Sequence, residues 1–188
     1  MKASSIGLVL SVCLLGGTSV RADIITFDQF VNTGAVGFEN FTSGTEAGFT
    51  ITNGNVNNLA VSPNPGGGDL SVGHKAAGNP GTIIQIDRGG DLFAFGGLDL
   101  KWVFSANPDV SVTGYTGSFG GTVIGTESYG LTGGFVTHVA TAGAGLLGDL
   151  ITHLEINLGV GVGQTLVNNL NVAVPEPSSF AFLALVAT

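Results

Sequence analysis

The chain has 188 residues, of which 44% are hydrophobic and only 10% are charged, and it contains 32 glycines at a net charge of −8. This length has room for one domain plus terminal signals, and the low charge disfavours long solvated helices. The glycines follow no triplet repeat with proline, which excludes collagen. The acidic balance leaves no basic patch, which makes nucleic acid and anionic lipid headgroups poor partners.

The first 22 residues have the layout of a secretory signal peptide. Lys2 precedes an apolar stretch over residues 6–15, which is too short for a membrane-spanning helix, and small residues flank Arg21 before Asp23. We therefore expect signal peptidase to cleave between Ala22 and Asp23. The single cysteine lies inside this segment. Without disulfides, the exported domain depends on its core, its turns and any bound ion.

From Asp23 onward, short apolar runs alternate with glycine, asparagine and proline, a pattern that predicts strands joined by tight turns. Residues 62–81 are rich in proline, glycine and asparagine and are expected to form a surface loop. The predicted strands occupy residues 24–27, 48–52, 59–61, 82–86, 98–104, 110–115, 122–124, 135–139, 150–158 and 166–172.

Two-residue alternation is clearest over residues 98–104 and 150–158. In the second of these, Leu154 and Ile156 share one face, and His153 and Glu155 share the other. Residues 140–148 fit either a loop or a short helical turn. The whole pattern predicts an all-β fold, an antiparallel β-sandwich or jelly roll of roughly eight to ten strands over residues 23–173, flanked by terminal sorting segments.

Little in the sequence indicates catalysis. No Gly-x-Ser-x-Gly elbow is present, the predicted mature chain has no cysteine, and the three histidines form no close pair for zinc. A glycosidase needs two carboxylates that face each other, and its candidates would be Glu39, Glu46, Glu127 and Glu155. We favour solvated surface charges for these residues and expect a protein that is not an enzyme.

No cofactor is certain from the sequence, but calcium is a candidate structural ligand. Calcium prefers carboxylate, amide and backbone oxygens, which turns supply. Asp28, Glu39 and Asn40 near the start of the chain, with Asn168 near its end, could meet where the first and last strands adjoin. The spacing matches no EF-hand.

Aromatic residues near glycine-rich turns are the candidate contacts for a sugar. Tyr115, Phe119 and Tyr129 lie in or beside such turns. An exposed ring beside polar side chains stacks well on a sugar, but the same rings could instead cover the ends of the core.

The last fifteen residues carry the strongest functional signal. Pro175-Glu176-Pro177 is followed by two serines and the apolar run 180–186. This tail, residues 174–188, resembles the PEP-CTERM sorting signal of exported bacterial proteins, without the long membrane helix and basic cluster that complete that signal. The resemblance implies processing by a membrane protease-transpeptidase, exosortase, and association with exopolysaccharide and biofilm matrix.

Three functions follow from these observations. The first is an exported cell-surface or extracellular-matrix protein with a structural or binding role beside exopolysaccharide, which touches the membrane only transiently through its termini. The second is a carbohydrate-binding jelly-roll module. The third is a secreted glycoside hydrolase whose carboxylates the sequence does not reveal.

Overall fold

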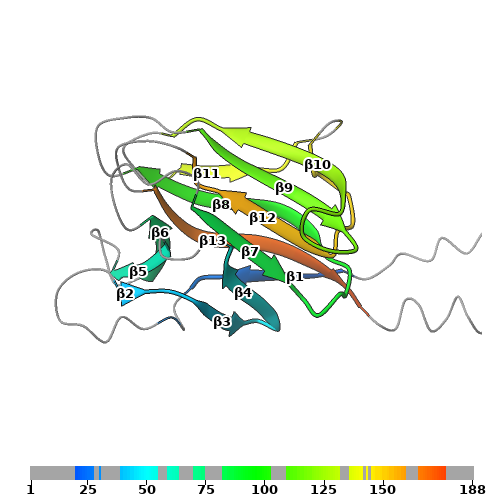
Figure 1. Cartoon of the computed structure of the whole chain (residues 1–188). Coiled ribbons are helices and arrows are strands. Elements are labelled where there is room, and N and C mark those ends of the chain that lie inside the picture. The colour runs from blue at the N-terminus through cyan, green and yellow to red at the C-terminus, as the bar shows by residue number, and fades with distance from the viewer. Residues whose placement is uncertain are drawn as a thin grey trace, which may run out of the picture.

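The computed structural model describes residues 20–27, 30, 39–54, 59–63, 70–74, 82–102, 109–131, 136–141, 143, 145–159 and 165–176. These residues form two antiparallel sheets that pack face to face and contain no helix (Figure 1). An all-β sandwich is therefore confirmed. No helix in this part of the chain is long and apolar enough to cross a membrane.

The larger sheet has seven strands. In spatial order these are β11 (Val136–Val139), β8 (Ala94–Trp102), β13 (Thr165–Pro175), β6 (Leu70–His74), β5 (Leu59–Pro63) and β2 (Glu39–Asn40), while β1 (Val20–Ile25) also pairs with β13. Strand β13 is long enough for both β1 and β6 to pair along it, β1 at residues 170–175 and β6 at residues 166–167.

The smaller sheet has six strands. In spatial order these are β10 (Thr122–Tyr129), β9 (Val110–Thr116), β12 (His153–Asn157), β7 (Ile83–Asp87), β4 (Phe49–Asn53) and β3 (Ser43–Glu46). Strands β3 and β4 form a hairpin whose two turn residues, Ala47 and Gly48, both have positive φ. That backbone matches the twist of the flanking strands, and glycine adopts it without a steric penalty.

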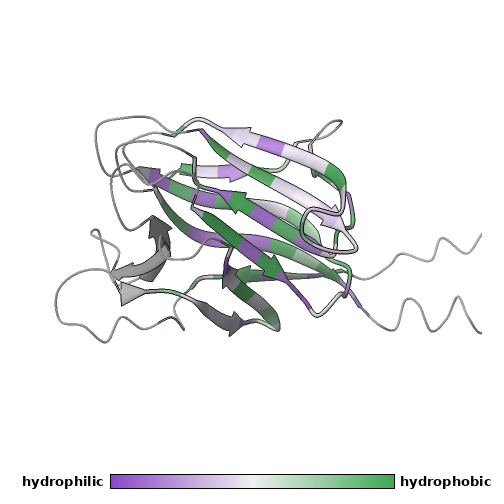
Figure 2. Ribbon diagram, in the orientation of Figure 1, coloured by the Kyte–Doolittle hydropathy of each residue, from purple (hydrophilic) through white to green (hydrophobic). Residues whose placement is uncertain are grey.

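The core fills the space between the two sheets. Every second residue of β4, β7, β9 and β12 is buried, so the apolar residues of the smaller sheet point inward (Figure 2). Aromatic rings pack edge to face inside, with the Phe49 and Phe93 ring centroids 5.1 Å apart. Such pairs add about 0.5–1.5 kcal/mol to the burial of their area.

Some details differ from the sequence-based expectation. The described residues form thirteen strands, more than the eight to ten that were expected. Several of them are short or carry few large apolar residues, as in β3, so their sequences show no clear strand pattern. Strand β6 lies within residues 62–81, which were expected to form a loop. Strand β12 begins only at His153, and before it the alternation shifts, so that Leu150 is exposed and Ile151 is buried through its bridge to Phe93.

The first and last strands lie side by side. Val20 pairs with Pro175 and Ile25 pairs with Leu170, so both ends of the described chain leave from the same end of the sandwich (Figure 1). Strand β1 begins three residues before Asp23, and β13 runs to Pro175, past the predicted domain boundary at residue 173.

Candidate functional site

The outer surface of the six-stranded sheet carries mostly polar side chains, interrupted by Val123 and Ile83, and we call it the polar face. Strand register aligns these side chains in rows across the sheet. The first row is Thr45, Thr50, Asp87, His153, Tyr115 and Val123; the second is Ser43, Thr52, Gln85, Glu155, Thr113 and Thr126; a third contains Ile83, Asn157, Ser111 and Ser128.

The polar face follows from the two-residue period of the strands. Because the alternate positions are apolar and buried, the intervening polar residues all point to solvent on one side. Neighbouring strands lie about 4.8 Å apart, so the six strands span about 24 Å. A surface of this width can contact several units of an extended polymer.

Hydrogen bonds order the second row. The Gln85 amide Nε2 donates to Glu155 Oε2 at 3.5 Å, and the hydroxyl oxygens of Thr113 and Thr126 lie 3.2 Å apart. These bonds join neighbouring strands through their outer side chains and hold hydroxyl, amide and carboxylate groups in a fixed array. Glu155 lies near the centre of that array, on the third strand of six.

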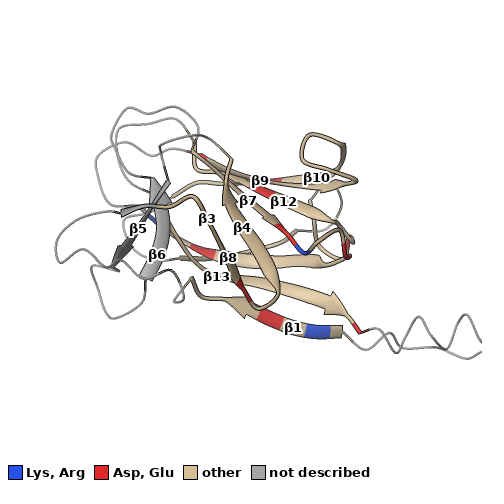
Figure 3. Ribbon diagram, turned by 60° about the horizontal axis from the view of Figure 1, so that its bottom comes forward, with Lys and Arg blue, Asp and Glu red and all other residues tan. Residues whose placement is uncertain are grey.

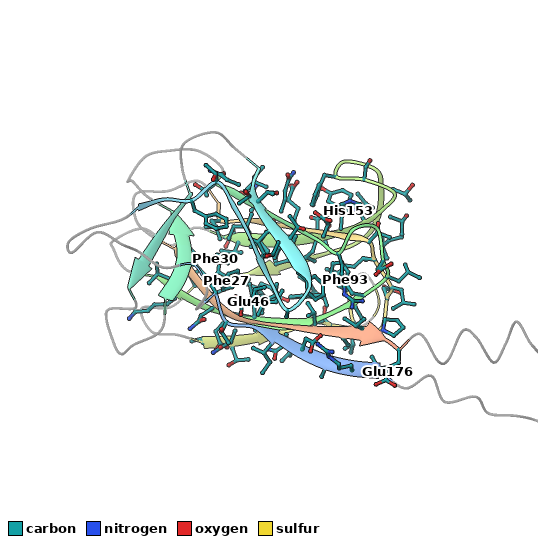
Figure 4. The ribbon with its side chains drawn as sticks, turned by 90° about the horizontal axis from the view of Figure 1, so that it is seen from below. Phe27, Phe30, Glu46, Phe93, His153 and Glu176 are labelled. Atoms are coloured by element: carbon teal, nitrogen blue, oxygen red, sulfur yellow. The ribbon has the colours of Figure 1, made fainter. Side chains whose placement is uncertain are left out.

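An aromatic corner lies beside the first row, where β9 ends and β12 begins. Phe119, from the β9–β10 turn, meets the His153 ring edge to face at a centroid distance of 4.6 Å. Figure 4 shows His153 well away from the cluster of Phe27, Phe30 and Glu46. The Thr152 hydroxyl lies 2.8 Å from His153 Nδ1 and accepts a hydrogen bond from Gly117 N at 3.1 Å, which ties the turn to the strand.

Tyr115 lies beside this corner, in line with His153 on the neighbouring strand. Its side chain is half-buried on the polar face. Burial raises the pKa of the Tyr115 phenol, and the nearby Glu155 carboxylate raises it further. Tyr115 is thus a neutral ring with an accessible surface and a carboxylate close to it.

Tyr129 requires a correction. The sequence placed it with Tyr115 as a candidate sugar contact, but it lies on the inner side of β10 and is only 8% exposed. Its hydroxyl donates to the Val139 carbonyl at 3.3 Å, and its ring packs on His138 with centroids 4.7 Å apart. Tyr129 closes the edge of the core and is not part of the polar face.

Two of the predicted calcium ligands, Asn40 and Asn168, lie on strands that are not adjacent. Asp28 lies outside the described residues, and only the backbone is described for Glu39 and Asn40. Strands β5 and β6 separate β2 from β13, so three strand spacings, about 14 Å, lie between Asn40 and Asn168. Asn168 is 3% exposed and accepts a hydrogen bond from Asn169 N. Within the described residues no cluster of three metal-binding side chains occurs.

Two of the four candidate glycosidase carboxylates are structural. Glu127 is 4% exposed, and its Oε1 accepts hydrogen bonds from Thr141 N at 2.7 Å and Leu146 N at 2.8 Å. Glu46 is 7% exposed, and its Oε1 accepts from Thr26 N at 2.7 Å and Thr26 Oγ1 at 2.9 Å. Glu127 points into the sandwich and Glu155 points out of it, so these two carboxylates do not face a common cleft.

The predicted processing positions fall on the paired terminal strands. Ala22 and Asp23 lie in β1 opposite Ala173 and Val172. Pro175 is the last residue of β13 and Glu176 follows it, whereas Pro177 lies outside the described residues. Cleavage after Ala22 and sorting through this motif stay predictions.

The sequence had already indicated one part of the polar face. The alternation in β12 placed His153, Glu155 and Asn157 on a single side, which the structure confirms. Their contacts with Gln85, Tyr115 and Phe119 come from other strands and turns. Only the order and register of β7, β12 and β9 bring these residues together, and local periodicity does not encode either.

Comparison with known proteins places the fold beside carbohydrate-binding modules. No protein-family model matches the chain, and no curated protein sequence is similar to it. A mutant of the family 29 module CBM29-2 superposes with a TM-score of 0.50 at 13% identity, covering 82% of this chain and 93% of that one. At this identity the similarity shows a shared fold.

Two further solved structures are similar at lower scores. The family 29 module CBM29_1 from Piromyces equi has a TM-score of 0.45 at 9% identity and covers 85% of this chain and 94% of its own. The module TmCBM61, solved in complex with beta-1,4-galactotriose, has a TM-score of 0.40 at 8% identity and covers 69% of this chain and 90% of its own.

Proposed function

We propose that this protein is an exported carbohydrate-binding module that binds polysaccharide on the polar face. The observation that carries the proposal is the face itself: ordered hydroxyl, amide and carboxylate side chains with Tyr115 and Phe119 at one end. Saccharides present both hydroxyls and apolar C–H faces, so a suitable surface combines hydrogen-bonding groups with an aromatic platform. The shared fold with a carbohydrate-binding module supports the same conclusion.

Each group on the polar face has a role in this proposal. The Tyr115 ring stacks on a sugar ring, and Gln85 and Glu155 form hydrogen bonds with sugar hydroxyls. Threonine hydroxyls on both sides extend the contact along the polymer. The Phe119–His153 contact and the Thr152 bonds hold the aromatic corner in place, which lowers the entropy lost on binding.

Export and sorting are the second part of the proposal. The signal peptide directs the chain out of the cytoplasm, and the tail that resembles PEP-CTERM signals is processed by an exosortase-like enzyme, so that the protein resides at the cell surface or in the biofilm matrix. The geometry is compatible with a tether, because both ends leave one end of the sandwich while the polar face runs along its side (Figure 1). Exopolysaccharide would then be the natural ligand.

The test is affinity electrophoresis of the purified protein through gels that contain soluble polysaccharides. We expect retardation by at least one polysaccharide and a roughly five-fold or greater loss of affinity in Tyr115→Ala, since truncation of a stacking ring costs about 1–3 kcal/mol. Tyr129→Phe is the matched control, because it alters a tyrosine on the neighbouring strand that faces the core.

The alternatives make different predictions. If no polysaccharide retards the protein, and its surface location still requires the tail, a purely structural matrix role replaces the binding role. If the protein cleaves a polysaccharide and a single Glu→Gln change abolishes that cleavage, the protein is a hydrolase. Equal affinities for the wild type and Tyr115→Ala would remove the polar face from the proposal.

A further inference from the structure

We propose that the polar face prefers glycans that carry free amines, such as partly deacetylated amino-sugar polymers, over neutral glycans, and that it binds glycans with carboxylates or sulfates more weakly than neutral ones. This inference rests on the proposed function, because it assigns a charge class to the ligand of the same surface. It follows from where the charges lie and from what surrounds them.

Both acidic residues of the polar face lie on its central strands. Glu155 is on β12 and Asp87 is on the adjacent β7, one row away. Both side chains are partly solvent-accessible, so a ligand can reach them. Hydrogen bonds hold each carboxylate in position, from Gln85 Nε2 to Glu155 at 3.5 Å and from Gly89 N to Asp87 Oδ1 at 2.9 Å.

None of the described lysine and arginine residues belongs to the rows of the polar face, and Figure 3 marks their positions along the ribbon. Arg88 follows β7, but its guanidinium carbon lies 5.8 Å from the centroid of the inward-facing Phe49 ring, and its Nη1 lies 3.9 Å from Asp91 Oδ2. Lys101 and Arg21 belong to the other sheet. An anionic glycan on the polar face would therefore meet carboxylates with no lysine or arginine among the face residues to offset them.

The centre of the polar face also fits a cation directly. Tyr115 lies one row from Glu155 on the neighbouring strand, close enough for the carboxylate to act on its phenol. An ammonium group over an aromatic ring is attracted by the negative face of that ring, and an adjacent carboxylate adds a charge-assisted hydrogen bond. A sugar amine that lies over Tyr115 would contact both groups at once.

The size of the preference is limited by solvent. Charge pairs at exposed positions are weak and are screened by salt over about 10 Å at 0.1 M. We therefore expect amine-bearing polymers to bind about two- to five-fold more tightly per site than neutral ones, and this advantage should disappear in high salt.

The experiment compares three probes in affinity electrophoresis and calorimetry: a partly deacetylated chitin oligomer, a neutral glucomannan and a polyuronate. We expect affinity to fall in that order, with the polyuronate bound about two- to five-fold more weakly than the neutral glucomannan. Glu155→Gln keeps the size of the side chain and the hydrogen bond to Gln85 but removes the charge, so it should remove most of the amine preference, measured as the ratio of the affinities for the amine-bearing and the neutral glycan. Asp87→Asn should also lower the preference for the amine-bearing glycan over the neutral one.

The control is Asp99→Asn, which makes the same charge change on the other sheet, where Asp99 accepts a hydrogen bond from Asn169 Nδ2 at 2.8 Å. It should leave all three affinities unchanged. If neutral and amine-bearing glycans bind equally, or if Asp99→Asn lowers the amine preference as much as Glu155→Gln does, the charge inference is wrong while glycan binding stands. If none of the probes binds, and no other polysaccharide does, the proposed function itself fails.

Discussion

Glu127 offers the sharpest test of the packing described above, because one buried carboxylate holds a loop against the sandwich. Its Oε1 accepts hydrogen bonds from the backbone nitrogens of Thr141 and Leu146, and its Oε2 accepts one from Thr141 Oγ1 at 2.8 Å. Leu146 is fully buried, and a side chain at Gly114 would collide with it. The loop therefore completes the core beside β9 and β10.

Substitution by alanine removes all three acceptor contacts and leaves the two backbone nitrogens without their partner. A buried donor left unsatisfied costs about 1–3 kcal/mol, so we expect Glu127→Ala to lower the free energy of unfolding by about 3–5 kcal/mol. Glu127→Gln keeps one carbonyl oxygen for the backbone bonds but loses the charge and the second oxygen, which accepts from Thr141 Oγ1. We expect a loss of about 1–2 kcal/mol for that variant.

The pH dependence provides an independent measurement. Burial alone would raise the pKa of Glu127, but the hydrogen bonds from Thr141 and Leu146 outweigh it and lower the pKa below that of an ordinary glutamate. A carboxyl whose pKa is lower in the folded state stabilises the protein above the pKa of the unfolded state. That stability is lost as the pH falls through the folded pKa. Glu127→Gln should therefore flatten the decline in stability below about pH 4.5.

Urea unfolding followed by circular dichroism measures both effects, at neutral pH and across the acid range. Thr141→Val is the partial control, because it removes the hydroxyl contact and keeps the backbone bond. If Glu127→Ala changes the free energy of unfolding by less than about 0.5 kcal/mol, the range of ordinary surface substitutions, the carboxylate does not hold the loop.

Three further variants test other features. Gly44→Ala should destabilise by about 1–3 kcal/mol in urea unfolding, because the added Cβ would collide with Phe30 Cε1; no change would show that the ring has room to move. Ala47→Gly should stabilise by about 1 kcal/mol or less, since φ at Ala47 is 52°, a left-handed conformation that glycine adopts more easily than alanine. A loss of stability would show that Ala47 does not have this conformation. Burial lowers the pKa of His138, whose Nε2 is buried without a hydrogen-bond partner, so stability should fall as the pH drops from 7 to 5. His138→Phe should remove that fall in thermal melts, and an unchanged pH profile would refute the assignment.

The sequence was sufficient to predict the class of fold, because strand alternation is a local property. Leu154 and Ile156 are buried and His153 and Glu155 face out, as the two-residue period requires. The short strands were harder to predict. Strand β3 reads Ser-Gly-Thr-Glu, and it is a strand only because its register with β4 satisfies its backbone.

The candidate site was only partly predictable, for a related reason. Tyr115 and Tyr129 lie near similar turns, yet Tyr115 faces solvent and Tyr129 faces the core. Ile124 lies at an irregularity in the β9–β10 pairing, so the alternation of inward and outward side chains along β10 shifts by one residue between Val123 and Gly125. A one-residue shift of this kind exchanges the two faces of a strand. Nothing in the spacing of the tyrosines shows where such a shift occurs.

The position of the chain ends relative to the polar face bears on how the protein could bind a polymer. Val20 pairs with Pro175, so β1 begins and β13 ends at the same end of the sandwich. The rows of the polar face cross the strands of the six-stranded sheet, and the aromatic corner lies at this same end, because Ile151 bridges to Phe93 and Ala94 pairs with Ala173. In the proposed binding mode, a sugar stacked on Tyr115 would therefore lie near the chain ends, and the rest of the polymer would extend from there across the outer side of the six-stranded sheet.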